Sequence, residues 1–307
     1  MKIHLNPKRI KQENFDFIVN KFPNLIFETN IEKSHDCEAI IVDPNYVAIT
    51  NILKYPNLKW IQLYTAGYDK IDLDFLKTKN IQLTNAKDIY SIPIAEDVVA
   101  KILMINRNVK HYLKAMESRS WQPIYNEPEI NNSVIGIVGV GSIGQEIAKK
   151  MKAFNTKVIG YRRKKSKVDG FDEIYTGLEG LDELLKRSDY IILALDLNKD
   201  SRGLINYEKF NLMKRNAVLI NIARGEIVVQ EDLIAALKNH CIRAAAIDVM
   251  TPEPLPSNHE LWELDNIYVT PHVSASSEYT LNRLRDLFIE NINNYLNQEK
   301  LINEVDE

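Results

Sequence analysis

A glycine-rich stretch at residues 134–144 constrains the fold of this chain more than any other segment. It reads VIGIVGVGSIG, an apolar run followed by three glycines spaced Gly139-x-Gly141-x-x-Gly144. Helical periodicity follows, with apolar side chains at Ile143, Ile147, Met151 and Phe154. Glycines in this arrangement permit a tight turn, let a pyrophosphate approach the backbone, and let the helix pack closely on the strand.

The turn therefore predicts a dinucleotide site. The N-terminus of a helix supplies N–H groups and positive potential to phosphates. We expect the contacts at Gly139, Gly141, Ser142, Ile143 and Gly144. The alternative is a plain structural turn, which is less favoured here because the required strand and helix flank the motif and a second strand follows.

Apolar runs alternate with helical segments along almost the whole chain, which is typical of parallel sheets covered by helices. Strands are predicted at 39–42, 58–64, 81–84, 134–138, 157–161, 190–195, 217–222, 244–249 and 267–270. Helices are predicted near 8–20, 46–54, 72–79, 93–116 and 277–297. The fold class expected is α/β, with two doubly wound parallel-sheet (Rossmann-like) domains and a terminal helix that packs back on the first.

Composition excludes several classes of function. Hydrophobic residues make up 45% and charged residues 26% of the 307 positions, with a net charge of −3, so nothing favours binding to nucleic acid or anionic lipid. No apolar run is long enough to cross a membrane, and the N-terminus lacks the apolar stretch of a signal peptide. Only Cys37 and Cys241 occur, which predicts a reducing, cytoplasmic location without a disulfide framework or a metal site.

A basic turn follows the second strand of the dinucleotide unit. In this type of unit an acidic residue at that place receives the ribose hydroxyls of NAD. Here the strand ends at Tyr161 and continues as Arg162, Arg163, Lys164 and Lys165, with no carboxylate. Guanidinium groups can bind a ribose 2′-phosphate, so NADP(H) is the preferred cofactor and NAD(H) a possible one. A solvated basic turn and a short nucleic-acid patch are the alternatives.

Three polar residues follow the ends of late predicted strands, where open α/β sheets bind ligands. Arg224 comes after Asn221-Ile222-Ala223, Glu253 after Asp248-Val249-Met250, and His272 after Thr270-Pro271. Reduction of a 2-keto acid needs an acid for the carbonyl oxygen, which histidine supplies when a carboxylate favours its protonated form. It also needs a cation for the substrate carboxylate, which arginine binds with two hydrogen bonds. Taken singly, each residue has a structural alternative, as do the other histidines.

At this point the sequence resembles the D-2-hydroxyacid dehydrogenase family over most of its length. The matching segments are Thr65-Ala66-Gly67-Tyr68-Asp69, Asn85, Pro93-Ile94-Ala95-Glu96, Gly139–Gly144, Arg202-Gly203-Leu204-Ile205-Asn206, Asn221-Ile222-Ala223-Arg224-Gly225, Ala246-Ile247-Asp248-Val249, Glu253-Pro254-Leu255-Pro256 and Thr270-Pro271-His272. Their order, spacing and identity together make a chance similarity very improbable.

The resemblance implies a role for each residue. Arg224 would bind the carboxylate and keto oxygen of the substrate, His272 would donate the proton, and Glu253 would orient it. Backbone N–H groups around Ala66, Gly67 and Tyr68 would also bind that carboxylate. Asp248 would face the nicotinamide carboxamide or its neighbourhood, and Ala223 would contact the cofactor.

The resemblance also implies the organisation of the molecule. Residues 1–95 plus 275–307 would form a substrate (flavodoxin-like) domain and residues 96–274 the dinucleotide-binding Rossmann domain. An interdomain cleft would hold the reaction, and members of the family are commonly homodimers. The basic turn resembles the NADPH-using glyoxylate and hydroxypyruvate reductase branch more than the NAD-using lactate or phosphoglycerate branches. The family resemblance implies a small (R)-2-hydroxy acid as the product.

Three points stay open: the shape of one cofactor loop, the function, and the residues of the side-chain pocket. Asp196 stands where relatives often have proline, so the shape of that cofactor loop does not follow from the resemblance. A non-catalytic NAD(P)-sensing regulatory or scaffold protein on the same fold is a second function, and NAD-dependent phosphoglycerate dehydrogenase a third. The side-chain pocket is undetermined, because Tyr64, Tyr68, Tyr90 and Met250 fit a pocket or a core equally well.

Overall fold

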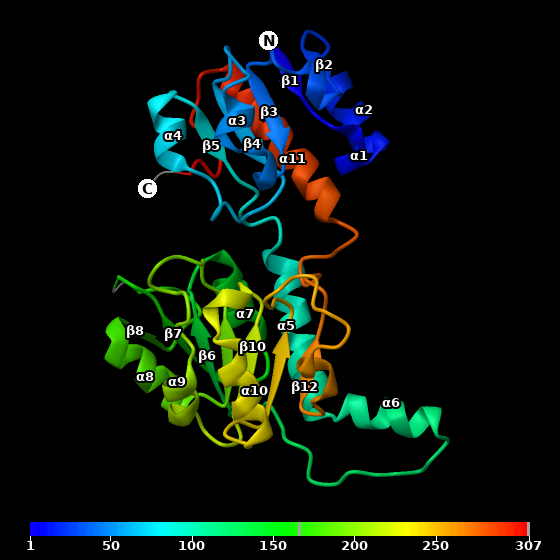
Figure 1. Ribbon diagram of the computed structural model, residues 1–307, viewed down its shortest axis with the longest axis vertical. Helices are drawn as coiled ribbons and strands as arrows, with labels where there is room; N and C mark the ends of the chain where they lie inside the picture. Colours follow the sequence, from blue (N-terminus) through cyan, green and yellow to red (C-terminus); the bar gives the residue numbers. More distant parts are fainter. Residues whose placement is uncertain (165–166, 306–307) are drawn as a thin grey trace. The chain divides into compact units, whose positions relative to one another are not determined.

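The computed structural model describes residues 1–164 and 167–305, so Lys165 of the basic turn lies outside the described residues. The chain divides into two compact units (Figure 1). Unit 1 comprises Met1–Tyr90 and Ser277–Glu307, and unit 2 comprises Ser91–Ser276. No helix among the described residues has the length and apolar character needed to span a membrane.

Unit 1 alternates short strands and helices. Its strands are β1 (Lys2–His4), β2 (Ile26–Glu28), β3 (Ala39–Val42), β4 (Trp60–Leu63) and β5 (Gln82–Thr84). Its helices are α1 (Pro7–Ile10), α2 (Gln12–Lys21), η1 (Ile31–Lys33), η2 (Pro44–Tyr46), α3 (Ile49–Ile52), α4 (Leu73–Thr78) and α11 (Thr280–Leu296). The described strands pair in parallel in the order β2-β1-β3-β4-β5.

Both faces of this sheet are buried, because successive side chains of β3 enter different cores. Ala39 and Ile41 pack with α1, α2 and α11, whereas Ile40 and Val42 pack with α3 and α4. The C-terminal helix α11 contributes Phe288 to the first core, where its ring meets Tyr64 edge to face. The predicted return of the terminal helix to the first part of the chain is confirmed.

Unit 2 contains the longer series of elements. Its strands are β6 (Val134–Val138), β7 (Lys157–Tyr161), β8 (Glu173–Tyr175), β9 (Tyr190–Leu193), β10 (Val218–Asn221), β11 (Ala244–Ile247) and β12 (Ile267–Val269). Its helices are α5 (Ser91–Asn106), α6 (Val109–Glu117), α7 (Ser142–Lys152), α8 (Gly177–Arg187), α9 (Tyr207–Leu212), η3 (Gly225–Ile227), α10 (Gln230–Lys238) and η4 (Glu260–Glu263).

The sheet of unit 2 fixes where ligands bind. Its described strands are all parallel, in the order β12-β11-β10-β9-β6-β7-β8. The chain therefore starts in the middle at β6, builds outward to β8, and returns to build the other half from β9. In such a doubly wound sheet ligands bind at the carboxyl ends of the strands, near the point where the order reverses. That point lies between β6 and β9, and the predicted α/β class with two parallel sheets is confirmed.

Four sequence-based predictions need correction. The single helix expected near 8–20 is interrupted at Lys11 (φ 66°), which separates α1 from α2. The single helix expected over 93–116 is two helices, because Asn108 adopts a left-handed conformation (φ 49°) between α5 and α6. Asparagine tolerates this region better than most residues, so it can interrupt a helical pattern. The strands β1, β2 and β8 were not predicted: each has only three residues, and each includes a polar or charged residue that interrupts the apolar run. The helix predicted near 46–54 exists but is shorter, since only α3 (Ile49–Ile52) and the last residue of η2 are helical there.

Candidate active site

The glycine turn excludes side chains at two of its three glycines. Gly139 follows β6 with φ +106°, and a Cβ there would lie 2.3 Å from the Ala194 carbonyl oxygen. A Cβ on Gly144 would lie 2.1 Å from the carbonyl oxygen of Gly139. The turn therefore packs tightly against both its own helix and the end of β9, as close helix–strand packing requires.

The middle glycine is different, because space lies above it. A Cβ on Gly141 would meet no atom within 4 Å among the described residues, and its backbone is extended. Gly141 is also the N-cap of α7, and a glycine has no side chain to cap the helix with a hydrogen bond. The first N–H groups of a helix have no acceptor inside it. An open cradle at an uncapped helix N-terminus, with Ser142 and Ile143 in its first turn, fits a pyrophosphate.

The basic turn leaves the same edge of the sheet from the neighbouring strand β7. Arg162 is half-buried, and its backbone N–H donates to the Tyr175 carbonyl (3.1 Å), which ties the start of the turn to β8. The side chains of Arg163 and Lys164 are exposed. Because β6 and β7 are adjacent, the basic turn begins beside the glycine turn.

The loop after β9 carries Asp196 in place of the expected proline. Its shape comes from side-chain hydrogen bonds: Ser201 Oγ donates to the Asp196 carbonyl (2.7 Å), and Asn198 Oδ1 accepts from the Asp200 and Ser201 backbone N–H groups (2.9 and 3.1 Å). The Asp196 side chain is exposed. This local network takes over the shaping role that a proline ring would have.

Arg224 follows β10 on a short segment whose backbone is restrained by hydrogen bonds to Asn221. Asn221, the last residue of β10, donates from Nδ2 to the Arg224 carbonyl (3.0 Å) and accepts from the Ala223 N–H (3.1 Å). Arg224 Nη1 donates to the Ala223 carbonyl (2.7 Å). At the next residue, Gly225, a Cβ would lie 2.4 Å from the Met250 carbonyl carbon, so this segment packs directly against the one after β11.

His272 and Glu253 form a hydrogen-bonded pair. His272 Nδ1 lies 2.8 Å from Glu253 Oε2, and the two side chains are 50% and 35% exposed. The second carboxylate oxygen, Glu253 Oε1, accepts from the Met250 backbone N–H (3.1 Å), which fixes the carboxylate. With Nδ1 engaged, Nε2 is the nitrogen that remains for a substrate.

Asp248 anchors the turn that carries His272. Its carboxylate is 2% exposed and accepts from Thr270 Oγ1 (2.5 Å), the Val273 N–H (3.0 Å) and the Ser274 N–H (2.8 Å). Burial alone would raise the pKa of Asp248, but these three hydrogen bonds outweigh burial and lower the pKa below its usual value. Asp248 is therefore ionised at neutral pH and acts as an acceptor for the whole turn.

The topology brings these residues to one edge. β10, β11 and β12 are neighbours, and Arg224, Glu253 and His272 each follow the carboxyl end of one of them. Glu253 and His272 are in contact, and Arg224 lies on the segment that packs against Met250. The predicted residues Ala223 and Asp248 lie in the same strand-end segments and are both buried.

The loop after β4 in unit 1 holds the remaining predicted residues. Ala66, Gly67 and Tyr68 are half-buried, and Asn85 Nδ2 donates to the Ala66 carbonyl (2.9 Å). Thr65 Oγ1 donates to the Gly67 carbonyl (3.0 Å). Side chains beside the loop therefore hold its carbonyl groups, which fixes the path of the peptide units between them.

The three aromatic candidates for a substrate pocket belong to the cores of unit 1 or pack against them. Tyr64 is buried against Phe288, Tyr90 Oη donates to the Tyr64 carbonyl, and Tyr68 packs against the second core. Met250 is buried in the core of unit 2.

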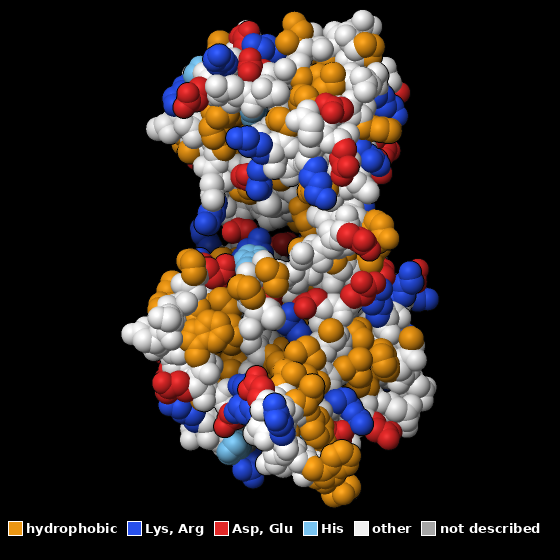
Figure 2. All heavy atoms as spheres, turned by 90° about the vertical axis from the view of Figure 1, so that its right-hand side faces the viewer, with side chains coloured by type: hydrophobic (Ala, Val, Ile, Leu, Met, Phe, Trp, Pro, Cys, Tyr) orange, Lys and Arg blue, Asp and Glu red, His pale blue; other side chains and the backbone are white. Residues whose placement is uncertain are grey.

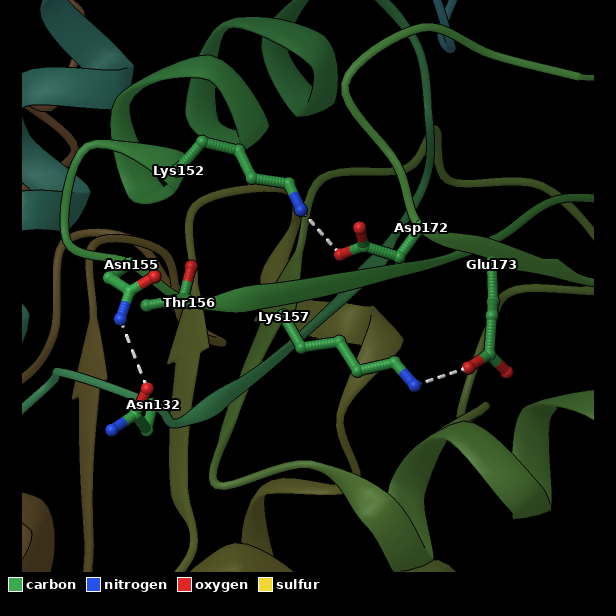
Figure 3. A pocket seen from close by; sticks show the side chains of 7 residues that line it. All are labelled: Asn132, Lys152, Asn155, Thr156, Lys157, Asp172 and Glu173. Atoms are coloured by element: carbon green, nitrogen blue, oxygen red, sulfur yellow. Dashed lines mark hydrogen bonds and ion pairs between the residues drawn. The ribbon is translucent and has the colours of Figure 1, made fainter.

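A hollow on unit 2 at the opposite edge of the sheet is a poor candidate for the site (Figure 3). Its charged side chains neutralise one another: Lys152 pairs with Asp172 (2.5 Å) and Lys157 with Glu173 (2.6 Å). Hydrogen bonds from Arg187 and Lys157 hold the pKa of Glu173 well below its usual range. No unbalanced charge among these residues recruits a charged ligand.

Sequence reasoning missed two supporting residues, Thr270 and Asn221. Each is a polar residue at or just after the end of an apolar strand, and each directs a hydrogen bond into a segment that carries a candidate site residue. A polar side chain terminating an apolar strand is the signal that would have found them.

The chain is similar to known proteins along most of its length. Residues 99–274 match the family model described as D-isomer specific 2-hydroxyacid dehydrogenase, NAD binding domain. The chain is 34% identical over 275 residues to a glyoxylate reductase of Pyrococcus furiosus, across 86% of this chain and 81% of that protein.

Solved structures extend the similarity to nearly the whole chain. An acyclic imino acid reductase in complex with NADPH and D-Arg has a TM-score of 0.87 at 28% identity, covering 99% of this chain and 100% of that one. An NADPH-dependent glyoxylate/hydroxypyruvate reductase of Sinorhizobium meliloti, in complex with NADP and sulfate, has a TM-score of 0.81 at 26% identity, covering 99% and 98%.

The two kinds of glycine predict different consequences of an added methyl group. Gly141→Ala should leave the melting temperature within about 3 °C of the original, since the methyl group meets no protein atom, but weaken NADPH binding about tenfold or more because it enters the pyrophosphate cradle. Gly144→Ala should lower both stability and binding, since its methyl group would overlap the Gly139 carbonyl. Thermal melts and fluorescence titration with NADPH measure the two effects, and a Gly141→Ala protein that binds NADPH normally would contradict the assigned cradle.

Proposed function

The chain belongs to the D-isomer specific 2-hydroxyacid dehydrogenase family, and we propose that within it this NAD(P)-dependent oxidoreductase reduces a small 2-keto acid, with NADPH as preferred donor, to the (R)-2-hydroxy acid. The observation that carries the proposal is the His272–Glu253 pair at 2.8 Å, on strand ends of the same sheet edge as Arg224 and the glycine turn. Glyoxylate and hydroxypyruvate are the first substrates to test.

The proposed proton donor is His272. When bound, the nicotinamide cofactor supplies a hydride to the carbonyl carbon, which leaves negative charge on the carbonyl oxygen. His272 Nε2 gives its proton to that oxygen, and the Glu253 carboxylate at Nδ1 stabilises the imidazolium before transfer. Glu253 also holds the ring orientation, because its other oxygen is fixed by the Met250 N–H.

Substrate orientation is the proposed role of Arg224. Its guanidinium matches a carboxylate with two parallel hydrogen bonds, which places the neighbouring keto group at a defined distance from the charge. The Asn221 and Ala223 contacts restrain the backbone of the segment that bears it. Ala66, Gly67 and Tyr68 of unit 1 are proposed to add backbone N–H contacts to the same carboxylate, supported by the side-chain bracing of that loop.

The domain roles follow from these assignments. We assign substrate binding to residues 1–95 with 275–307 and dinucleotide binding to residues 96–274. The family model matched over 99–274 supports the second assignment. A cytoplasmic location is part of the same proposal, supported by the presence of only two cysteines in 307 residues.

The preference for NADPH has a specific physical basis. Arg162 and Arg163 begin the turn at the carboxyl end of β7, where an acidic residue would serve NAD, and no carboxylate follows Tyr161 directly. Guanidinium groups at this place can bind a 2′-phosphate with charge-assisted hydrogen bonds, with Lys164 adding positive charge. The NADPH and NADP in the two solved relatives support the same preference.

A homodimer is the proposed assembly. In Figure 1, α6 and the segment after it extend away from the sheet of unit 2. Large apolar side chains on this arm are exposed: Leu113, Met116, Tyr125 and Trp121, the last at 96%. Figure 2 looks toward this side of unit 2, where hydrophobic side chains gather. Exposed apolar area of this kind marks a surface that another protein covers, and the proposed partner is a second copy.

Replacing the proposed acid should remove chemistry and spare binding. His272→Ala should lower kcat for glyoxylate with NADPH by about 10²- to 10⁴-fold, the usual contribution of a general acid. NADPH affinity should change little, because the glycine turn is untouched. His240→Ala, which alters an exposed histidine at the far end of α10, is the matched control. A His272→Ala enzyme with near-normal kcat would disprove the assignment of the acid.

Removing the two arginines should change cofactor choice. Arg162→Ser/Arg163→Ser should lower kcat/KM for NADPH by about 10²- to 10⁴-fold, since each of the two charge-assisted hydrogen bonds lost is worth about 1.5–3 kcal/mol, and should leave kcat/KM for NADH nearly unaffected. Arg215→Ser, at an exposed position before β10, controls for lost charge. If wild-type enzyme uses NADH better than NADPH, the preference is wrong. No turnover of any keto acid despite tight cofactor binding would favour the sensor alternative.

The arm predicts the assembly state. Light scattering should give twice the chain mass for the wild type, and Met116→Ser/Trp121→Ser should shift it toward the monomer, because two exposed apolar anchors are lost. Trp262→Ser, a partly exposed tryptophan outside the arm, should remain dimeric. A wild-type monomer at micromolar concentration would contradict the dimer.

A further inference from the structure

α5 buries a charged residue among apolar ones. Ile94, Val98, Ile102 and Ile105 are buried on this helix, and Lys101 lies with them at 2% exposure. An ammonium group is almost never buried to this degree unless it is paired and hydrogen-bonded. An apolar side chain could fill the same volume, so the charge at this position calls for a specific partner.

The partners of Lys101 form a closed triangle. Its Nζ pairs with the Asp97 carboxylate one turn earlier on α5 and donates to Ser274 Oγ (3.3 Å). Ser274 Oγ in turn donates to Asp97 Oδ2 (2.5 Å). The ion pair alone would be local to the helix, but its hydrogen bonds to the Ser274 hydroxyl connect it to a segment 173 positions further along the sequence.

Ser274 belongs to the turn that bears His272. The Ser274 and Val273 N–H groups bind the Asp248 carboxylate, and the His272 N–H donates to the Asp248 carbonyl (2.9 Å). One face of the turn is thus fixed by Asp248 and its end by the Asp97–Lys101 pair. Lys101 is connected to the proposed acid through one side chain and two peptide units.

His272 itself is in a strained conformation that needs such support. Its φ is +55°, in the left-handed region that residues with a Cβ seldom adopt. A conformation of this kind persists only where surrounding contacts over-determine it, and it occurs preferentially at functional sites. A buried ion pair contributes little stability compared with apolar packing, and its better-attested use is to select one arrangement.

We propose that Lys101, together with Asp97, is a positioning residue that holds the His272 turn in its productive conformation through the hydroxyl of Ser274. The inference rests on the proposed role of His272 as proton donor. The pair touches no substrate, and its effect reaches the imidazole only through the backbone of residues 272–274.

The test compares two lysines that tie helices of unit 2 to opposite ends of β12. Lys101→Met removes the contact beyond its carboxyl end. Lys110→Met is the matched control, because Lys110 Nζ donates to the Leu264 and Ile267 carbonyls at the amino end (2.7 and 3.4 Å). Hydrogen exchange of amides 272–274 is measured first, then kcat and KM for glyoxylate with NADPH, and the Kd of NADPH.

In Lys101→Met, amides 272–274 should exchange about tenfold faster or more, and kcat should fall about tenfold, while KM and the Kd of NADPH change less than about threefold. In Lys110→Met the same amides and kcat should stay within about twofold of wild type, whatever the loss of melting temperature. Unchanged exchange in Lys101→Met, or equal acceleration in both variants, would overturn the anchor. Faster exchange with an unchanged kcat would overturn the positioning of His272.

Ser274→Ala tests the same contact if Lys101→Met does not fold. It retains the Asp97–Lys101 pair and both N–H contacts to Asp248, and removes only the hydroxyl. It should reproduce the faster exchange and lower kcat, and wild-type behaviour in both would overturn the proposal. Wild-type protein without activity on any keto acid would count against the proposed function alone, because hydrogen exchange still decides the anchor.

Discussion

The parallel alignment of the strands in unit 2 is the constraint on which the rest of the site depends. Every described strand of that sheet runs in the same direction, so the chain reaches the same edge each time a strand ends. The glycine turn, the basic turn, and the segments of Arg224, Glu253 and His272 all leave from that edge. Residues more than a hundred positions apart can therefore serve one reaction without any of them being close in sequence.

The parallel alignment of the strands does not by itself orient the side chains at their ends. The buried Asp248 carboxylate orients the turn that bears His272. Burial disfavours the charge of Asp248, yet three hydrogen bonds favour it more strongly. The ionised carboxylate accepts hydrogen bonds from Thr270, Val273 and Ser274 and so holds these three residues close together. A positive φ of this type costs about 1–3 kcal/mol, and these contacts offset that strain at His272.

Much of this arrangement could be predicted from sequence, for definite reasons. Strands covered on both faces are continuous apolar runs, and this is why the sheet of unit 2 was largely predicted, apart from β8. The order of polar residues at strand ends placed Arg224, Glu253 and His272 at one edge. The break at Asn108 was not predicted, because helical periodicity persists on both sides of it. The contact of Lys101 with Ser274 could not be predicted either, since nothing local relates them.

The close packing at Gly225, which leaves no room for a side chain, has a consequence for how the substrate preference of such an enzyme can change. With no space between this residue and the Met250 backbone, the segment that bears Arg224 packs directly against the segment that leads to Glu253. Enlarging either segment would displace the other, and with it the Glu253 carboxylate that is hydrogen-bonded to His272. New preferences for the substrate side chain are therefore expected to arise in loops outside these two segments, with Arg224, Glu253 and His272 kept in place while selectivity changes.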